Sequence, residues 1–243
     1  MNQELANYKK NELGPVGNFS FGTENIITQD IRLPKILLMQ QMSEFCSDDR
    51  IQARPGELRE SFEGQKLGDK ANPLKIIPFY FTNTWTVKKE ENGKMVFART
   101  EVRTGADIQR EYETFENGVK HTNHRTLNIF ALIKGGNLSV PYMISLMNKS
   151  FTEAAQPFLN KAQLLKAEGK APAFITWALA SDITENDKGK FYYFTLEAVK
   201  ENGKDVYNTQ EELQYAQKAY QSMTNQLSQG AKIDMSDLEE APY

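Results

Sequence analysis

Residues 77–88 alternate apolar and polar side chains, and this alternation constrains the fold more than any other feature of the sequence. The odd-numbered positions are apolar except Asn83, and after Pro78 the even-numbered positions carry Tyr, Thr and Lys. A period of two residues is typical of a strand with one buried face. The pair Asn92-Gly93 follows, and it accepts the positive φ angles of a tight hairpin turn. The sequence therefore predicts an antiparallel hairpin whose second strand spans residues 95–103.

Strand patterns continue along the chain without the alternation of strands and helices that marks a parallel sheet. Further strands are predicted over residues 126–133, 138–147, 174–180 and 190–199. One helix is expected after a capping box at Ser150 to Glu153, with Pro157 as its kink or true start, and another after Thr209. These elements predict a mainly β chain with α additions. The specific expectation is an OB-like antiparallel β-barrel with an internal helix, a C-terminal helix and a disordered acidic tail.

Several classes of protein are excluded by composition. No apolar run approaches the roughly 20 residues that span a bilayer, and no secretory signal opens the chain. The single cysteine, Cys46, cannot form an internal disulfide. We therefore expect a cytoplasmic protein with no membrane partner.

Charge and aromatic side chains are unevenly distributed along the chain. The total of 29 Lys and Arg against 32 Asp and Glu gives a net charge of -3, which alone argues against a nucleic-acid partner. Residues 66–200, however, hold 19 basic and 14 acidic residues and 17 of the 26 aromatic residues. The last ten residues contain four acidic residues and no basic one. The middle of the chain is thus both basic and aromatic, while the end is acidic.

Strand parity indicates which of these side chains face away from the core. A protein that binds single strands needs cations for the phosphates and aromatic faces for the bases. Parity places one set of aromatic and basic residues on the outer faces of the strands, whereas Trp85 and Trp177 fall in inward registers. The candidate nucleic-acid-binding residues are Tyr80, Lys88, Phe97, Arg99, Arg103, Phe130, Phe191 and Tyr193. Strands covered on both faces would instead bury the aromatics as core, and the sequence leaves this alternative open.

The last ten residues carry the most specific motif. Acidic residues are followed by Ala241, Pro242 and a terminal Tyr243. The order resembles the C-terminal tip of bacterial single-stranded DNA-binding proteins and, more loosely, the tails of their phage counterparts. The resemblance implies an OB-fold and a tail that binds replication and repair enzymes through Asp234, Asp237, Glu239, Glu240, Pro242 and Tyr243. A tail that only confers solubility is the alternative. The stretches 33–40 and 54–57 also resemble the start of phage-encoded proteins of this size.

Catalytic and metal-binding patterns are weak in this sequence. His121 and His124 lack the further Cys or His that a zinc site needs. The thiol of Cys46 lies beside two aspartates, whose charge would raise its pKa and weaken it as a nucleophile. Glu168 and Lys170 form a fragment found in some nucleases. We predict no catalytic residue, no metal site and no cofactor.

Together these patterns predict a non-enzymatic, phage-encoded protein that binds single-stranded DNA without strong sequence preference. It would protect DNA in the host cytoplasm during replication, recombination or repair and recruit partner enzymes through its tail. The alternatives are a phage structural or host-takeover interaction module and, less favoured, a metal-dependent nuclease. The apolar stripe of the last helix leaves a homodimer open. The predicted parts are a flexible N-terminal arm (1–30), an OB-like nucleic-acid-binding domain (31–207), a C-terminal helix (208–230) and an acidic partner-binding tail (231–243).

Overall fold

A computed structural model describes residues 33–102, 111–187 and 189–228 of the chain. The predicted N-terminal arm and acidic tail lie outside these residues. Strands dominate, as predicted, and helices lie between and after them. The strands are β1 Ile36–Leu38, β2 Leu58–Glu60, β3 Lys66–Gly68, β4 Leu74–Glu91, β5 Lys94–Val102, β6 Glu113–Glu116, β7 Val119–Ile133, β8 Pro141–Met147, β9 Trp177–Asn186, β10 Gly189–Ala198, β11 Lys200–Glu201 and β12 Lys204–Asp205. The helices are α1 Glu44–Ser47, η5 Phe151–Ala155, α2 Gln156–Ala167, η6 Pro172–Phe174 and α3 Gln210–Ser228.

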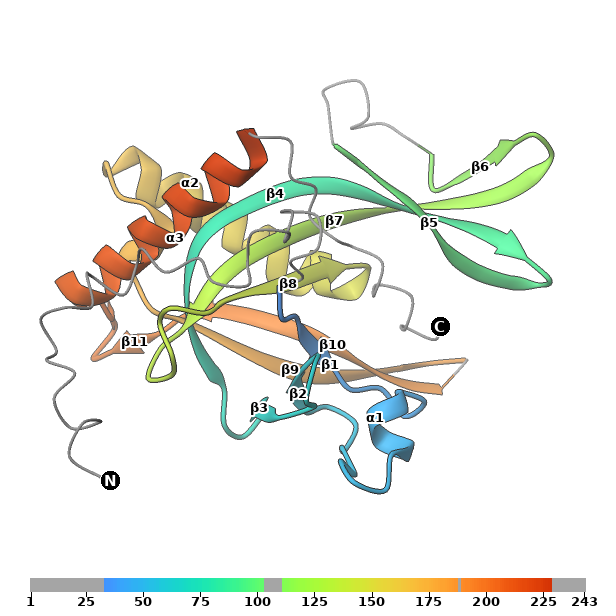
Figure 1. The fold of residues 1–243 in the computed structure, drawn as a ribbon, viewed down its shortest axis with the longest axis horizontal. Helices are drawn as coiled ribbons and strands as arrows, with labels where there is room; N and C mark the ends of the chain where they lie inside the picture. Colours follow the sequence, from blue (N-terminus) through green and yellow to red (C-terminus); the bar gives the residue numbers. More distant parts are fainter. Residues whose placement is uncertain (1–32, 103–110, 188, 229–243) are drawn as a thin grey trace, which may run out of the picture.

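Two long antiparallel strands, β4 and β7, form the spine of the molecule (Figure 1). They pair from Ile76 opposite Ile133 to Lys89 opposite His121. The predicted hairpin after β4 is confirmed, because Asn92 and Gly93 have φ angles of 52° and 76° and β5 returns along β4. The far ends of β4 and β7, together with β5 and β6, extend away from the helices and are called the projection below (Figure 1).

The near ends of β4 and β7 pair with other strands of the same seven-stranded sheet than their far ends do. There β4 pairs with β9 over Leu74–Ile76, β9 pairs with β10, and β8 runs along the other side of β7. The β4–β7 register shifts between Pro78 and Tyr80. Proline has no N–H to donate to a neighbouring strand, so a bulge is where a strand tolerates it. The bulge lies between the segments in which β4 pairs with β9 and with β5.

Helices cover both faces of the near sheet, and this overturns part of the parity prediction. On one face, Ala154, Ala155 and Phe158 pack with Ile129 and neighbouring strand residues in the main core. On the other face, Met223 of α3 packs on Phe130 and Met143 of the sheet, and Ala216 on Ile77 and Leu132. Strand β7, which was expected to expose one face, is therefore buried on both faces.

The two predicted helix starts have different outcomes. Thr209 and Glu212 form a reciprocal capping box, in which the Glu212 amide donates to Thr209 Oγ1 and the Thr209 amide donates to Glu212 Oε2. Ser150 does not cap its helix, because its Oγ accepts the amide of Phe194 on β10 at 2.9 Å. The helical segment instead begins with the π-helical turn η5, and α2 follows with Pro157 in its first turn. Pro157 therefore marks a start rather than a kink.

The predicted closed OB-like barrel is not confirmed, because the sheet is open. Its order is β10-β9-β4-β7, with β8 and β6 beyond β7 and β5 beside β4. Within the described residues, β10 pairs only with β9. The free edge of β10 therefore lies across a cleft from β1, and no ladder of hydrogen bonds joins the two strands. No described helix is long and apolar enough to cross a membrane.

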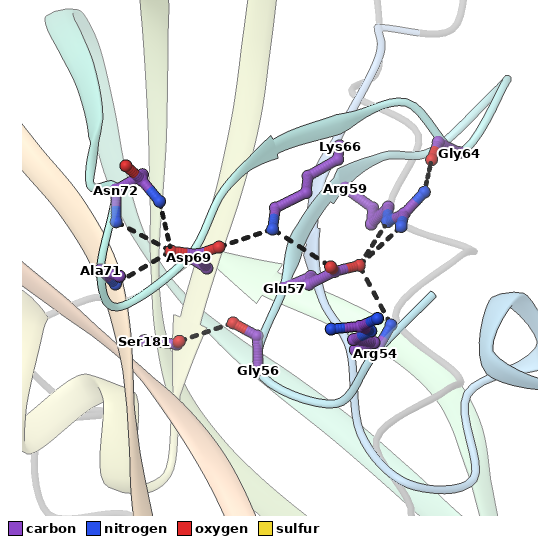
Figure 2. A network of polar contacts seen from close by, with 10 residues as sticks. All are labelled: Arg54, Gly56, Glu57, Arg59, Gly64, Lys66, Asp69, Ala71, Asn72 and Ser181. Carbon is purple, nitrogen blue, oxygen red and sulfur yellow. Dashed lines mark hydrogen bonds and ion pairs between the residues drawn. The ribbon is translucent and has the colours of Figure 1, made fainter. Parts of the chain in front are cut away.

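A small sheet of β1, β2 and β3 is held by a polar network that also reaches β9 (Figure 2). Glu57 accepts from Arg59 at 2.6 Å and from Lys66 at 3.1 Å, and Lys66 also contacts Asp69 at 2.5 Å. Burial raises the pKa of Glu57, but hydrogen bonds from the Arg54 amide and these cations leave it below its usual value. Ser181 of β9 donates to the carbonyl of Gly56 at 2.6 Å. The network fixes the segment that carries β1 against the main sheet.

Phe158 tests how far α2 stabilises the fold. Its buried ring lies 4.7 Å from Trp177 and 5.3 Å from Phe81 between centroids. We expect Phe158→Ala to lower the free energy of unfolding by about 3–5 kcal/mol in urea denaturation, because it leaves a cavity in the core. Leu164→Ala, on the same helix but 62% exposed, should change it by no more than about 0.5 kcal/mol. Equal effects of the two substitutions would contradict the packing described here.

Asp69 predicts a pH dependence of stability. Its pKa is lowered from 3.8 to about 2, mainly by the hydrogen bond from Lys66 and then by backbone donation from Asn72. A carboxyl group with a lowered folded-state pKa stabilises the fold above its unfolded pKa, and this contribution disappears as the pH falls toward 2.

Asp69→Asn removes the charge but keeps an oxygen for the amides of Ala71 and Asn72. In urea titrations we expect its deficit in unfolding free energy to be complete at pH 6 and to shrink between pH 4 and pH 2. Asp187→Asn in the exposed β9–β10 turn is the matched control and should change stability little. A deficit that is constant across this pH range would rule out the proposed electrostatic contribution.

Candidate nucleic-acid interface

The eight residues predicted to contact nucleic acid do not share one surface. Phe130 is 0% exposed and Lys88 is 2% exposed, so neither meets solvent as expected. Phe130 lies under α3, beside Met143 and Met223. Lys88 points with Thr86 and Thr84 into a buried polar layer of the β4–β7 pair. On β7 parity correctly separated Phe130 from Ile129, but both faces are covered. On β4 parity was wrong: Phe79 and Phe81, predicted on one face, lie on opposite faces, because the bulge between Pro78 and Tyr80 shifts the alternation.

Tyr80 and Phe97 belong to the packing around α3. The Tyr80 ring lies 5.6 Å from Phe130 and 6.2 Å from Tyr220, and Phe97 packs half-buried against the same cluster. The expected exposed aromatic surface on β4 and β5 is therefore contact area for the last helix. Trp85 and Trp177 are buried, as predicted.

Arg99 is engaged within the projection. Its guanidinium contacts Glu116 at 2.5 Å and Glu101 at 2.6 Å, and these hydrogen bonds raise its pKa, the one to Glu116 most. Because β5 and β6 lie on opposite sides of the β4–β7 pair, the Arg99–Glu116 contact shows that the projection curls. A cation with two carboxylate partners is a weak site for phosphate. Arg103 lies outside the described residues.

Phe191 and Tyr193 are the two predicted residues that line a cleft. The cleft has a volume of about 550 Å³ and lies where the sheet is open. One wall is β10 from Gly189 to Phe194, and the opposite wall is β1 with the loop that follows it. The last residues of β8 and the turn into η5 complete the lining. The sequence placed these two aromatics correctly on a strand but could not show which segment faces them.

The charges of the lining are of one sign. It contains Lys35, Lys149 and Lys190, and among the described residues that form it there is no Asp or Glu. Lys149 Nζ lies 5.6 Å from the centre of the Tyr193 ring, within cation–π range, and 2.8 Å from Glu153, which raises its pKa. Lys190 is exposed, whereas Lys35 is buried. This combination can hold an anionic group beside an aromatic face.

Side chains cap the edge of β10 where a neighbouring strand would otherwise pair. The Gln40 amide nitrogen donates to the carbonyl of Tyr192, and the Tyr192 amide donates to Gln40 Oε1, both at 2.9 Å. The Phe194 amide donates to Ser150 Oγ. An exposed strand edge offers unpaired groups to other chains. Gln40 and Ser150 satisfy these backbone groups of β10. The gap between β10 and β1 therefore stays open as a cleft and is not closed by a ladder of hydrogen bonds.

Tyr112 extends the aromatic lining from the start of β6. It is 58% exposed, and its ring contacts the His124 ring edge-on at 5.2 Å. Burial lowers the pKa of His124, whose Nδ1 lies 2.6 Å from Asn148 Oδ1. His124 thus supports two lining residues, Tyr112 and Asn148, from below.

Sequence reasoning missed most of the polar lining. Lys190 directly precedes the aromatic run 191–194, and that adjacency could have indicated it. Lys35, Gln40 and Lys149 come from distant segments, and only the fold brings them to β10. No local pattern distinguishes them from ordinary polar residues.

The residues weighed for catalysis are dispersed. His121 and His124 are both buried on β7, and within the described ranges no group of three or more metal-ligating residues occurs. Burial, followed by the charge of Glu57, raises the pKa of Cys46, so the predicted direction is right but the neighbours differ. Glu168 is exposed at the end of α2 and contacts Lys170 at 3.0 Å.

Comparison with known proteins identifies a phage protein family. A family profile described as Pam3 phage gp34-like protein matches residues 12–224, which include all the strands and most of α3. Neither curated proteins nor solved structures give a match. The match supports the predicted phage origin and carries no statement of activity. Since it covers most of the sequence, the chain belongs to the Pam3 phage gp34-like protein family.

Proposed function

We propose that this phage protein binds single-stranded DNA through the cleft between β10 and β1. The observation that carries the proposal is the lining itself: it combines aromatic rings of β10 with three lysines, of which Lys149 lies beside Tyr193, and no carboxylate lines the described walls. Bases of any sequence can stack on aromatic faces, at about 1–3 kcal/mol per base, while cations hold the phosphates. Binding without strong sequence preference follows from this chemistry.

Under this proposal, base stacking and phosphate binding are carried out by different residues. Phe191 and Tyr193 lie on the same face of β10, as residues two apart in a strand do, and offer rings for stacking. The exposed Lys190 and Lys149, which lies beside Tyr193, are placed for phosphates. The proposal retains the aromatic strand of an OB-like site and does not require a closed barrel.

The acidic tail supports the second part of the proposal, the recruitment of replication, recombination or repair proteins. Its order of acidic residues, Pro242 and terminal Tyr243 resembles the tip of bacterial single-stranded DNA-binding proteins. A tail with four carboxylates in ten residues also competes with DNA for cationic sites. DNA in the cleft would then leave the tail available to partners in the host cytoplasm.

The two alternative functions make different predictions. A phage structural or host-takeover module would show no affinity for DNA and would bind a protein partner stably. A metal-dependent nuclease would cleave strands with magnesium or manganese and lose this activity in Glu168→Ala. The cleft favours DNA binding, since its described lining offers cations and stacking rings and contains no acidic residue or histidine.

Binding to a labelled 16-nucleotide oligo-dT, followed by fluorescence anisotropy, tests the proposal. We expect Lys149→Glu and Lys190→Glu each to weaken binding by about tenfold or more and to reduce the slope of log affinity against log salt by about 0.7. Phe191→Ala should cost about 1–3 kcal/mol. The matched control is Lys166→Glu, an exposed charge reversal at the far end of α2.

The proposal fails if wild-type protein shows no salt-sensitive binding to oligo-dT. It also fails if Lys166→Glu weakens binding as much as the cleft substitutions, because a diffuse charge effect would then explain the affinity. Duplex DNA and oligo-U in the same assay distinguish a preference for single-stranded DNA from general polyanion or RNA binding.

A further inference from the structure

We infer that the cleft is a pocket for about one to two nucleotides, rather than a section of a long groove. Its ligand would be a terminal nucleotide of a strand or a free nucleotide, which share one phosphorylated, stackable chemistry. The inference rests on the proposed function for the identity of the ligand. It adds the size of the site. Sequence-independent binders of the OB type have much longer sites, of about 4–16 nucleotides.

The dimensions of the cleft support a short site. Its volume of about 550 Å³ is typical of pockets that enclose one small-molecule ligand. The usable face of β10 runs from Lys190 to Phe194. Four steps of about 3.3 Å make this face only about 13 Å long.

The cleft is also blocked along β10 and at its base. Ser150 accepts the Phe194 amide, so the start of η5 stands against that end of the β10 face. Gln40 crosses from the β1 loop to the backbone of Tyr192. Buried Ile36 and Met143 form an apolar floor. A DNA strand that runs along β10 is therefore blocked by protein after a few nucleotides.

The number of cations matches a short ligand. Lys149 and Lys190 are the exposed basic residues of the described lining, and Lys149 shares its charge with Glu153, whereas Lys35 is buried and has interactions within the fold. A nucleotide with a terminal phosphate carries about two negative charges near neutral pH, which this set can balance. A groove for many nucleotides would need a row of cations beyond these walls.

A tryptophan reporter in the full chain tests the inference. Phe191→Trp places an indole in the cleft, whereas Phe115→Trp places one on the projection, at a side chain that is 70% exposed and is not part of the lining. A thymidine dinucleotide with a 5′ phosphate should quench Phe191→Trp saturably and leave Phe115→Trp unchanged. It should also displace labelled 16-nucleotide oligo-dT from the wild-type protein.

The length dependence of affinity sets the quantitative limit. From two to sixteen thymidines we expect a gain of no more than about fifteenfold, the number of dinucleotide registers on the longer strand. A continuous stacking groove would instead add about 1–3 kcal/mol with each further base.

Each outcome decides the inference. If oligo-dT binds but only strands longer than about four nucleotides compete, the short pocket is overturned and the proposed function stands. If the dinucleotide quenches both tryptophan variants equally, or if neither ligand binds, the inference is overturned, and the second of these results overturns the proposed function too. If the dinucleotide binds at Phe191→Trp but oligo-dT does not, the pocket is supported and single-strand binding is rejected.

Discussion

The long antiparallel pairing of β4 with β7 is the interaction on which the rest of the structure depends. One register, from Ile76 opposite Ile133 to Lys89 opposite His121, positions both parts of the seven-stranded sheet. The near ends recruit β9, β10 and β8, whereas the far ends recruit β5 and β6 into the projection (Figure 1). Because a slip of one residue would turn over the faces of one strand relative to the other, the apolar surfaces beneath α2 and α3 fix this register.

The gap between β10 and β1 is the part of this architecture on which the proposed function depends. The edge strand β10 has β9 on one side, and on the other side side chains replace a neighbouring strand, with Gln40 at Tyr192 and Ser150 at Phe194. The polar network around Glu57 holds the opposite wall in place (Figure 2). The space between the walls is therefore built into the fold. Its lysines and aromatic rings support a site for single-stranded DNA under the proposed function.

Local patterns predicted local structure well and long-range contacts poorly. The alternation over 77–88 and the pair Asn92-Gly93 predicted a hairpin that the structure contains, because both depend on backbone geometry within a few residues. The exposure of Phe130 was wrong, since α3 covers it from more than eighty positions away in sequence. Ser150 illustrates the same limit: its hydroxyl bonds to β10 and does not cap its own helix. For the candidate site, parity placed Phe191 on a strand face, but nothing local brings Lys35 and Lys149 to it.

Photochemical cross-linking tests the central claim, that single-stranded DNA binds in the cleft between β10 and β1, most directly. Wild-type full-length protein would be irradiated with a bromodeoxyuridine-substituted single strand, and the cross-linked peptides would be mapped by mass spectrometry. The account predicts adducts on the β10 face, Lys190 to Phe194, and on the facing loop 39–43. Adducts confined to the projection around Phe115 or to the exposed face of α3, or the absence of any adduct, would contradict it.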